Sequence, residues 1–382
     1  MMLSGKKVLV TGATGFIGGR LVEKLILEQG AFVRAFVHSF SHVARIARFS
    51  TGQLEMVAGD ISDRESVERA VSECDIVYHL AHDGKNLRMN IDGTRNIAEA
   101  CVLHNVQRLV YTSSIAVYEP LPDGDLDESA TPEYSGWEYA DCKILSENEV
   151  LRYAAESGLA ATVLYPTIVY GPYGTRWTDF VAKELLSGEV YLPDDGQGLC
   201  NPIYVDDLAD AIILAGESKA VAVEKFLISG PEPVPWADFY GAFERALGVQ
   251  SQVHRSSEEI ETLNRGILQK IRLVFKDPLS ILSWAPFKWK PVLNTIKFMR
   301  SKVSNNLVRK LQTSRLHIPD GELLALYKSR CHVRIDKAQL ALGYEPKFAF
   351  NKGMEETERF LRWAYLGESL NNNTGIPPQS RW

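Results

Sequence analysis

The sequence contains few cysteines and no paired arrangement of them. Its 382 residues include five cysteines, scattered and odd in number, and no two form a Cys-X-X-Cys pair. This pattern argues against a disulfide-stabilised scaffold and against a zinc site, and it fits a reducing compartment. We therefore expect a cytoplasmic protein that binds no metal.

Long apolar runs and an excess of positive charge are also missing. No uncharged apolar run reaches the length of about 18 residues that a transmembrane helix needs. The first strand pattern starts at residue 7, which leaves no room for a signal peptide. The net charge of −6 argues against general nucleic-acid binding. We expect a globular protein that acts on a small molecule and has no nucleic-acid partner.

A glycine-rich motif over Thr11–Gly18 (TGATGFIG) is the strongest positive feature. It follows an apolar, β-branched stretch that predicts a buried strand, and a helical pattern over 16–29 overlaps its end. In such a unit Gly12 allows a tight turn, Gly15 lets a pyrophosphate approach the backbone, and Gly18 lets the helix pack close to the strand. Free N–H groups at the helix start favour phosphate. The motif therefore predicts a dinucleotide site.

Strands and helices alternate through the first half of the sequence. Apolar stretches predict further strands at 32–37, 54–58, 76–80, 109–112 and 161–165. The clearest helical patterns between them cover 90–104 and 136–157. This alternation predicts an α/β fold with a doubly wound parallel sheet of the Rossmann type, which binds its ligands at the carboxyl ends of the strands.

The pattern loosens after residue 165 and predicts a smaller, mixed α/β lobe. Helices are expected at 179–187, 205–216, 236–247 and 352–365, with a strand at 226–228. We expect a dinucleotide-binding domain over 1–165, a C-terminal substrate-binding lobe over 166–366 and a disordered tail over 367–382.

Tyr139 and Lys143 are four residues apart in a predicted helix and therefore share one face. A nearby ammonium favours the phenolate, so we expect Lys143 to lower the pKa of Tyr139 and the pair to exchange a proton with an alcohol or ketone. Ser114 follows the strand predicted at 109–112, where it would hydrogen-bond the substrate oxygen. A Tyr-X-X-X-Lys pattern by itself is common, and a solvated helix face is the alternative.

In their order along the chain, these motifs resemble those of the extended short-chain dehydrogenase/reductases, the family of NAD-dependent epimerases and dehydratases. The resemblance covers about residues 6–215, and a weaker match resumes over 335–346. Beside the glycine motif and Tyr-X-X-X-Lys, it rests on Gly59-Asp60-Ile61, His79-Leu80-Ala81, Asn90–Asn96, Tyr165–Pro172 and Ile203–Ala209.

The resemblance implies a role for each matching residue. Tyr139 would be the catalytic acid and base, Lys143 would lower its pKa and hold the nicotinamide ribose, and Ser114 would polarise the substrate oxygen. Asp60 and Ile61 would meet the adenine. Tyr139 would also contact the cofactor, and the other cofactor contacts that the resemblance implies are Gly12, Thr14, Gly15, Phe16, Ile17, Gly18, Leu80, Ala81, Pro166 and Ile168. A homodimer built through the long helices is also implied.

The end of the second predicted strand departs from the pattern of relatives that prefer NAD. Those relatives carry an acidic residue there for the ribose 2′-hydroxyl. This chain reads Phe36-Val37-His38-Ser39, without an acid. His38, Ser39 and Arg45 would instead face a 2′-phosphate, so we expect NADP rather than NAD as the cofactor.

Two further departures bear on the substrate. Ile115 and Ala116 stand where dehydratases carry an acidic pair, so elimination of water is not expected. The loop between Ala81 and Asn90 is short for a sugar epimerase. A nucleotide sugar, turned over by an epimerase or dehydrogenase, is the first expectation from the resemblance. An NADPH-dependent reductase of a lipid-, steroid- or polyphenol-like ketone or aldehyde is the alternative, and a cofactor-binding regulator without turnover is the third.

A basic insertion over 265–315 is the largest departure. It contains twelve Lys or Arg residues and one acidic residue, Asp277, and its centre over 278–291 adds aromatic and aliphatic side chains. Three interpretations stay open: a solvated helical elaboration, peripheral contact with a membrane, and a lid over the substrate.

Four polar residues in the matching motifs are expected to be structural. His79 and Asn90 would hydrogen-bond within the fold, and Asp206 and Asp207 would cap the helix that begins near residue 205.

Overall fold

In the computed structural model, the described residues are 3–49, 52–84, 86–219, 223–265 and 316–367. They form two compact units. The first draws its residues from 1–180, 199–234 and 329–382, and the second from 181–198 and 235–328. The domain boundary predicted after residue 165 stays a prediction. Apart from their first residues, the basic insertion and the predicted tail lie outside the described residues.

A seven-stranded sheet forms the centre of the first unit, in the order β12-β7-β5-β4-β1-β2-β3. All neighbouring strands run parallel. The order reverses at β1, which lies between β4 and β2, and ligands bind beside such a reversal in doubly wound sheets. The strands are β1 (Lys7–Thr11), β2 (Phe32–Val37), β3 (Leu54–Ala58), β4 (Ile76–His79), β5 (Arg108–Thr112), β7 (Ala161–Pro166) and β12 (Glu224–Ile228).

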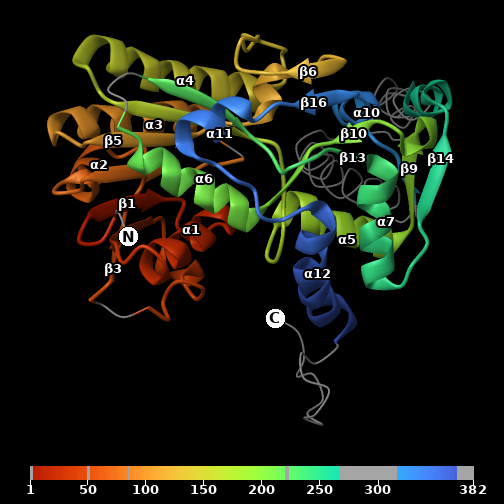
Figure 1. The fold of residues 1–382 in the computed structure, drawn as a ribbon, viewed down its shortest axis with the longest axis horizontal. Helices are drawn as coiled ribbons and strands as arrows, with labels where there is room; N and C mark the ends of the chain where they lie inside the picture. The colour runs from red at the N-terminus through yellow and green to blue at the C-terminus, as the bar shows by residue number, and fades with distance from the viewer. Residues whose placement is uncertain (1–2, 50–51, 85, 220–222, 266–315, 368–382) are drawn as a thin grey trace, which may run out of the picture. The chain divides into compact units, whose positions relative to one another are not determined.

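Helices cover both faces of this sheet, as Figure 1 shows. Successive side chains of β1 point to opposite faces, so Val8 and Val10 enter one apolar core and Leu9 the other. The first core also takes in α1 and α6, which contact each other, and the second takes in α2, α3 and α4. These helices are α1 (Phe16–Leu27), α2 (Arg64–Val71), α3 (Leu87–Leu103), α4 (Glu138–Ser157) and α6 (Val205–Glu217). The predicted Rossmann-type fold is confirmed.

Shorter elements complete the first unit. Two parallel strand pairs, β8 with β11 and β6 with β16, lie outside the main sheet. The remaining elements are η1 (Phe40–His42), η2 (Ile115–Tyr118), β6 (Gly124–Leu126), β8 (Ile168–Tyr170), η3 (Thr175–Phe180), β10 (Leu199–Cys200), β11 (Pro202–Tyr204), β16 (Cys331–Val333), α11 (Asp336–Leu342), α12 (Phe350–Leu361) and η6 (Arg362–Leu366). Strand β13 (Val234–Pro235) spans the boundary between the units.

The second unit has its own small parallel sheet, in the order β14-β9-β15. Its core is aromatic, with Trp236, Phe239 and Tyr240 of α7 fully buried and the Tyr240 hydroxyl 2.5 Å from that of Tyr327. The elements are α5 (Val181–Ser187), β9 (Glu189–Pro193), η4 (Asp194–Gly196), α7 (Trp236–Leu247), β14 (Gln252–Arg255), β15 (Leu316–His317) and α10 (Gly321–Lys328).

Asp206 and Asp207 do not cap α6, contrary to the expectation. Asp206 accepts two hydrogen bonds of 2.6 Å from the guanidinium of Arg20 on α1. Asp207 accepts the backbone N–H groups of Lys347 and Phe348. Both carboxylates therefore fasten α6 to neighbouring segments, because they face those segments and not the first turn of their own helix.

In the part of the chain that the structure describes, no helix is both long and apolar enough to cross a membrane.

Candidate active site

The glycine motif connects β1 to α1 in the way that its spacing predicts. Gly12 has a φ of +68°, and a Cβ there would lie 2.9 Å from the backbone nitrogen of Ala81. A Cβ on Gly18 would lie 2.1 Å from the carbonyl oxygen of Gly12, so the helix packs directly on the turn. Gly15 is exposed, and no side chain caps the start of α1. An exposed glycine before an uncapped helix start fits a pyrophosphate group.

A buried polar network joins β1 to the end of β4. The Thr11 hydroxyl accepts the N–H groups of residues 80 and 81 at 3.1 Å, so its own proton goes to Nδ1 of His79 at 2.7 Å. Nε2 of His79 then carries the ring proton and donates to Thr94 at 3.0 Å. Burial lowers the pKa of His79 to about 3, which keeps the ring neutral. His79 is therefore structural, as expected, and it positions the predicted contacts Leu80 and Ala81.

The residues predicted for the adenine lie beyond β2 and β3. Asp60 accepts the backbone N–H and the hydroxyl of Ser62 at 2.8 Å, and these hydrogen bonds lower its pKa. Its other oxygen lies 3.9 Å from Nε2 of His38, whose side chain is 83% exposed. Ile61 is buried against Gly93 of α3. Of this group, His38 is therefore the side chain most accessible to a ligand.

Arg45 reaches the start of α1 but already has protein partners. Its guanidinium pairs with Glu23 at 3.0 Å, donates to the carbonyl oxygen of Phe16 at 3.2 Å and lies 5.1 Å from the ring centre of Tyr173. Ser39 accepts the N–H of residue 41 within its own turn. The structure thus places Arg45 beside the glycine motif, where its guanidinium forms an ion pair with Glu23.

The three predicted catalytic residues come together at the carboxyl edge of the sheet. Ser114 follows β5, and its hydroxyl hydrogen-bonds that of Tyr139 in the first turn of α4. Lys143, one turn further along α4, is buried. Its ammonium donates to the carbonyl oxygen of Thr112 at 2.9 Å and lies 5.3 Å from the ring centre of Tyr111.

The protonation states of this group differ in part from the expectation. Burial raises the pKa of Tyr139, opposed by the hydrogen bond from Ser114, while burial lowers the pKa of Lys143 to about 8. Lys143 is not among the causes of the Tyr139 pKa shift in this structure, so the expectation that Lys143 lowers the pKa of Tyr139 stays a prediction. The ammonium is directed to the Thr112 carbonyl, and desolvation outweighs any help to the phenolate. Tyr139 keeps its proton at neutral pH, the state in which it donates to a carbonyl oxygen.

Two aromatic side chains that sequence reasoning missed lie against the Tyr139 ring. The His82 ring centre is 5.1 Å away and perpendicular, and the Trp137 ring centre is 5.3 Å away at 49°. No spacing rule marks either residue. The available signal was position, since His82 follows His79-Leu80-Ala81 directly and Trp137 precedes Tyr139 by two residues.

The remaining predicted contacts lie on the same edge of the sheet. Pro166 ends β7 and Ile168 begins β8, and both are buried. Ile115 and Ala116, after Ser114, are buried and apolar. The predicted contacts from β1, β4, β5 and β7 therefore follow the carboxyl ends of four adjacent strands, with Thr14, Phe16 and Ile17 in the turn and first residues of α1.

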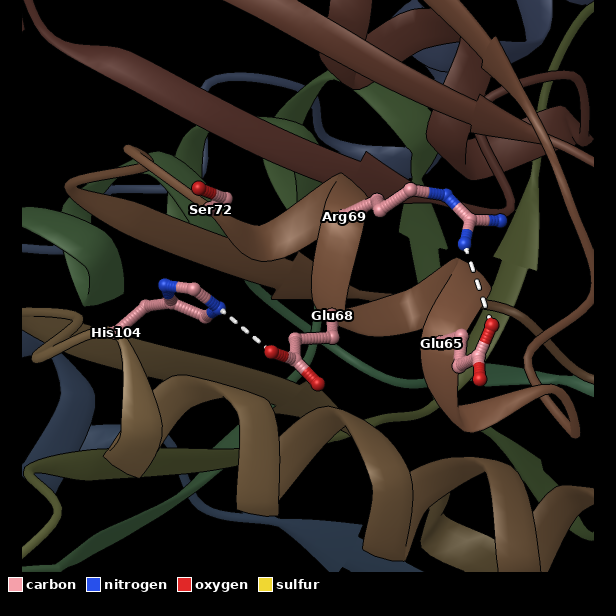
Figure 2. A pocket seen from close by; sticks show the side chains of 5 residues that line it. All are labelled: Glu65, Glu68, Arg69, Ser72 and His104. Atoms are coloured by element: carbon pink, nitrogen blue, oxygen red, sulfur yellow. Dashed lines mark ion pairs between the residues drawn. The ribbon is translucent and has the colours of Figure 1, made fainter.

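A shallow pocket between α2 and the end of α3 contains none of these residues (Figure 2). Its side chains form loose ion pairs, His104 with Glu68 at 3.9 Å and Arg69 with Glu65 at 3.8 Å. Such exposed pairs contribute little to stability, and nothing about them points to a ligand. Among the described residues, no cluster of three or more His, Cys, Asp or Glu side chains is arranged to hold a metal ion.

Comparison with known proteins gives relatives of several activities. The 2-alkyl-3-oxoalkanoate reductase of Stenotrophomonas maltophilia is 31% identical over 258 residues, 63% of this chain and 76% of that protein. The 3-beta-hydroxysteroid dehydrogenase of Mycolicibacterium neoaurum is 26% identical over 372 residues, 92% of this chain and 90% of that protein. UDP-glucose 4-epimerase of Thermotoga maritima shares the fold, with a TM-score of 0.65 and 21% identity over 94% of this chain and 99% of that chain.

The family model that matches this chain covers residues 8–228, from β1 to the end of β12. That range contains the glycine motif, Ser114, Tyr139 and Lys143, in agreement with the resemblance seen in the motifs. The chain belongs to the NAD dependent epimerase/dehydratase family.

Proposed function

We propose that this protein is an NAD(P)-dependent oxidoreductase that reduces a ketone on an apolar, ring-containing molecule other than a nucleotide sugar. The arrangement of Ser114, Tyr139 and Lys143 beside the glycine motif carries this proposal. A protonated Tyr139 hydroxyl that already hydrogen-bonds Ser114 is prepared to donate to a carbonyl oxygen, which suits the reducing direction.

Each group of residues has a task in this reaction. The exposed Gly15 and the start of α1 hold the pyrophosphate, and Lys143 holds the nicotinamide ribose. The bound nicotinamide supplies the hydride. Ser114 and Tyr139 bind the carbonyl oxygen, and Tyr139 gives it a proton as the alcohol forms. The buried Lys143 keeps α4 in register with β5 through its bond to Thr112.

The substrate class rests on three observations. The β4–α3 loop is short, the positions after Ser114 are apolar, and aromatic rings lie against Tyr139. Two curated relatives named above are a reductase of oxoalkanoates and a dehydrogenase of hydroxysteroids. A nucleotide sugar, the first expectation from the resemblance, has weaker support, because the likeness to the UDP-glucose 4-epimerase structure at 21% identity speaks for the fold alone.

NADP is proposed as the preferred form of the cofactor. No acidic side chain ends β2, and His38 is exposed there beside Asp60. The guanidinium of Arg45, paired with Glu23, lies near the start of α1. Titration of the purified protein with NADPH and NADH is expected to show tighter binding of NADPH. Tighter binding of NADH would assign NAD and leave the proposed reaction unchanged.

The bound nucleotide of the purified protein tests the choice between reductase and epimerase. A reductase must exchange its cofactor in every cycle, so we expect denatured protein to release far less than one equivalent of nucleotide. We expect the native protein then to oxidise NADPH with a ketosteroid or a dihydroflavonol. One equivalent of retained NAD, together with interconversion of UDP-glucose, would overturn the proposal in favour of an epimerase.

A further inference from the structure

More side chains contact Tyr139 than a catalytic acid and base needs. A proton donor needs a hydrogen-bonded hydroxyl and a positioned backbone, which Ser114 and Lys143 supply. Two more rings nevertheless lie against Tyr139: His82 from the loop after β4 and Trp137 from the residue before α4. They come from separate segments of the first unit, and both contact the ring that carries the proposed proton donor.

His82 is the less ordinary of the two. The residue as a whole is exposed, but its ring is partly covered and lies near the buried Lys143. Burial and the charge of Lys143 lower the pKa of His82 to about 4, so the imidazole is neutral at physiological pH and offers one N–H donor and one nitrogen acceptor. Within the described part of the chain, His79 has hydrogen-bond partners on both ring nitrogens, whereas His82 has none on either.

Trp137 offers a different kind of contact. It is half-buried, its ring is tilted against Tyr139, and it directly precedes the helix that carries Tyr139 and Lys143. Aromatic faces bind flat apolar rings through area and stacking geometry, and an indole provides a large face at low cost in side-chain entropy. Its N–H has no partner among the described residues, so the ring is held by packing.

We propose that His82 and Trp137 determine substrate specificity: Trp137 packs against a flat ring that carries the reacting ketone, and His82 hydrogen-bonds a second oxygen of the substrate close to that ketone. The inference rests on the proposed function and deepens it, since it names the substrate class as ring ketones with a neighbouring hydroxyl or carbonyl oxygen. A site built to hydrogen-bond a substrate group discriminates strongly against the analogue that lacks it, because its polar atom is then left unpaired.

The test uses two matched pairs of ketones that differ in one neighbouring hydroxyl. They are a dihydroflavonol with its flavanone, and 2-hydroxy-1-tetralone with 1-tetralone. With NADPH and wild-type protein, we expect kcat/KM to favour the hydroxylated member by about 10- to 100-fold, as for one hydrogen bond made in the transition state. Reduction of ketones without such a preference would overturn the inference while leaving the proposed function intact. Failure to reduce any ketone would overturn both.

Variants of His82 separate hydrogen bonding from packing. His82→Phe keeps a ring against Tyr139 and removes both nitrogens, so we expect the preference to fall to about one while kcat/KM for the unsubstituted ketone stays within about threefold. His82→Gln keeps a donor and an acceptor and is expected to retain most of the preference. If His82→Phe lowered kcat/KM equally for both members of a pair, or left the preference for the hydroxylated member unchanged, the proposed role of His82 would be contradicted.

Trp137→Ala is the companion variant. We expect it to raise KM for both members of each pair by a few-fold to about tenfold. The kcat/KM preference for the hydroxylated member should stay the same, because a ring contact does not distinguish the two members by their hydroxyl. Trp137→Phe is expected to recover most of the loss. Unchanged KM values in Trp137→Ala would contradict the ring contact. NADPH affinity and the thermal midpoint serve as controls, and all four variants should match the wild type in both.

Discussion

Tyr139 keeps its proton at neutral pH because burial penalises the phenolate more than the Ser114 hydrogen bond stabilises it. At the scale of single residues, this balance fits the proposed reduction, since a protonated hydroxyl can donate to a ketone oxygen. The residue types and spacing of Ser114, Tyr139 and Lys143 were predictable from the sequence. The direction of the Tyr139 shift was not, because burial depends on which distant segments cover the ring.

Tyr139→Phe removes the donor and leaves the ring contacts of His82 and Trp137 in place. We expect kcat to fall by about 10²- to 10⁴-fold, the usual contribution of a positioned acid. NADPH binding should change little, because the glycine motif and Lys143 are untouched. Steady-state kinetics and a binding titration check both parts. A variant that kept most of its activity would rule out Tyr139 as the acid.

Lys143→Met tests the buried ammonium. The pKa of Lys143 is about 8 in the folded protein against an ordinary 10.5, so the charge destabilises the fold below pH 8, and this penalty fades as pH rises to 10.5. We expect the variant to be inactive yet to gain about 1–3 kcal/mol in free energy of unfolding at pH 7, less the value of the lost bond to Thr112.

The extra free energy of unfolding of Lys143→Met over the wild type should shrink between pH 8 and pH 10. The wild type loses its buried charge in this range, whereas the variant has no charge to lose. Urea denaturation at both ends of this window measures the difference. Lower stability of Lys143→Met at every pH would contradict the desolvated ammonium.

At the scale of elements, the sequence predicted strands better than helix ends. The start of α3 was expected at Asn90, but the Asn90 amide is occupied with the backbone of Asp83 at 2.7 and 2.8 Å. Asn86 caps the helix instead, by accepting the N–H of Met89. The helix therefore begins three residues earlier than the sequence pattern indicates, because the loop places Asn86 at its first turn.

The helix predicted over 179–187 is present as α5, but it begins two residues later, at Val181. The structure has a π-helical turn, η3, followed by α5, and Trp177 inside the turn has non-helical backbone angles. The last predicted helix likewise divides into α12 and the turn η6. Apolar periodicity indicates which face of a helix is buried. It does not show where an α-helical turn is replaced by a π-helical turn.

Thr11→Val tests the connection between β1 and β4. Valine keeps the shape and removes the hydroxyl that accepts two backbone N–H groups and holds His79. We expect a loss of about 2–4 kcal/mol in free energy of unfolding, since buried donors are left without partners. Thr94→Val is the matched control and should cost less, because it removes two hydrogen bonds, from His79 and to the Asn90 carbonyl, where Thr11→Val removes three. Urea denaturation measures the loss for each variant. If both variants lost equally little free energy of unfolding, the hydrogen-bond network would not hold β1 and β4 together.

At the scale of the whole molecule, the dinucleotide site needs only the first unit. The glycine motif, Ser114, Tyr139, Lys143 and Pro166 all lie within 1–180. The basic insertion, by contrast, is attached within the residue range of the second unit. Homodimerisation, a cytoplasmic location and peripheral membrane contact stay predictions, and light scattering of the purified protein would decide the first of them.

Replacement of residues 266–315 by a short Gly-Ser linker is expected to leave NADPH affinity within about threefold of the wild type. All strands of the seven-stranded sheet lie outside the replaced segment, as their residue bounds show. Sedimentation with anionic liposomes, done on both proteins, tests the membrane interpretation of the insertion. Loss of NADPH binding on replacement would show that the dinucleotide site depends on the insertion.

Hydride transfer itself can be measured with NADPH in which both hydrogens on the transferring carbon of the nicotinamide are replaced by deuterium. Wild-type protein is incubated with this NADPH and a dihydroflavonol or ketosteroid, and the product alcohol is analysed by mass spectrometry beside that of Tyr139→Phe. We predict one deuterium on the new carbinol carbon with the wild type and almost no product with the variant. A product without deuterium, or equal labelled product from Tyr139→Phe, would contradict reduction by hydride transfer with Tyr139 as the proton donor.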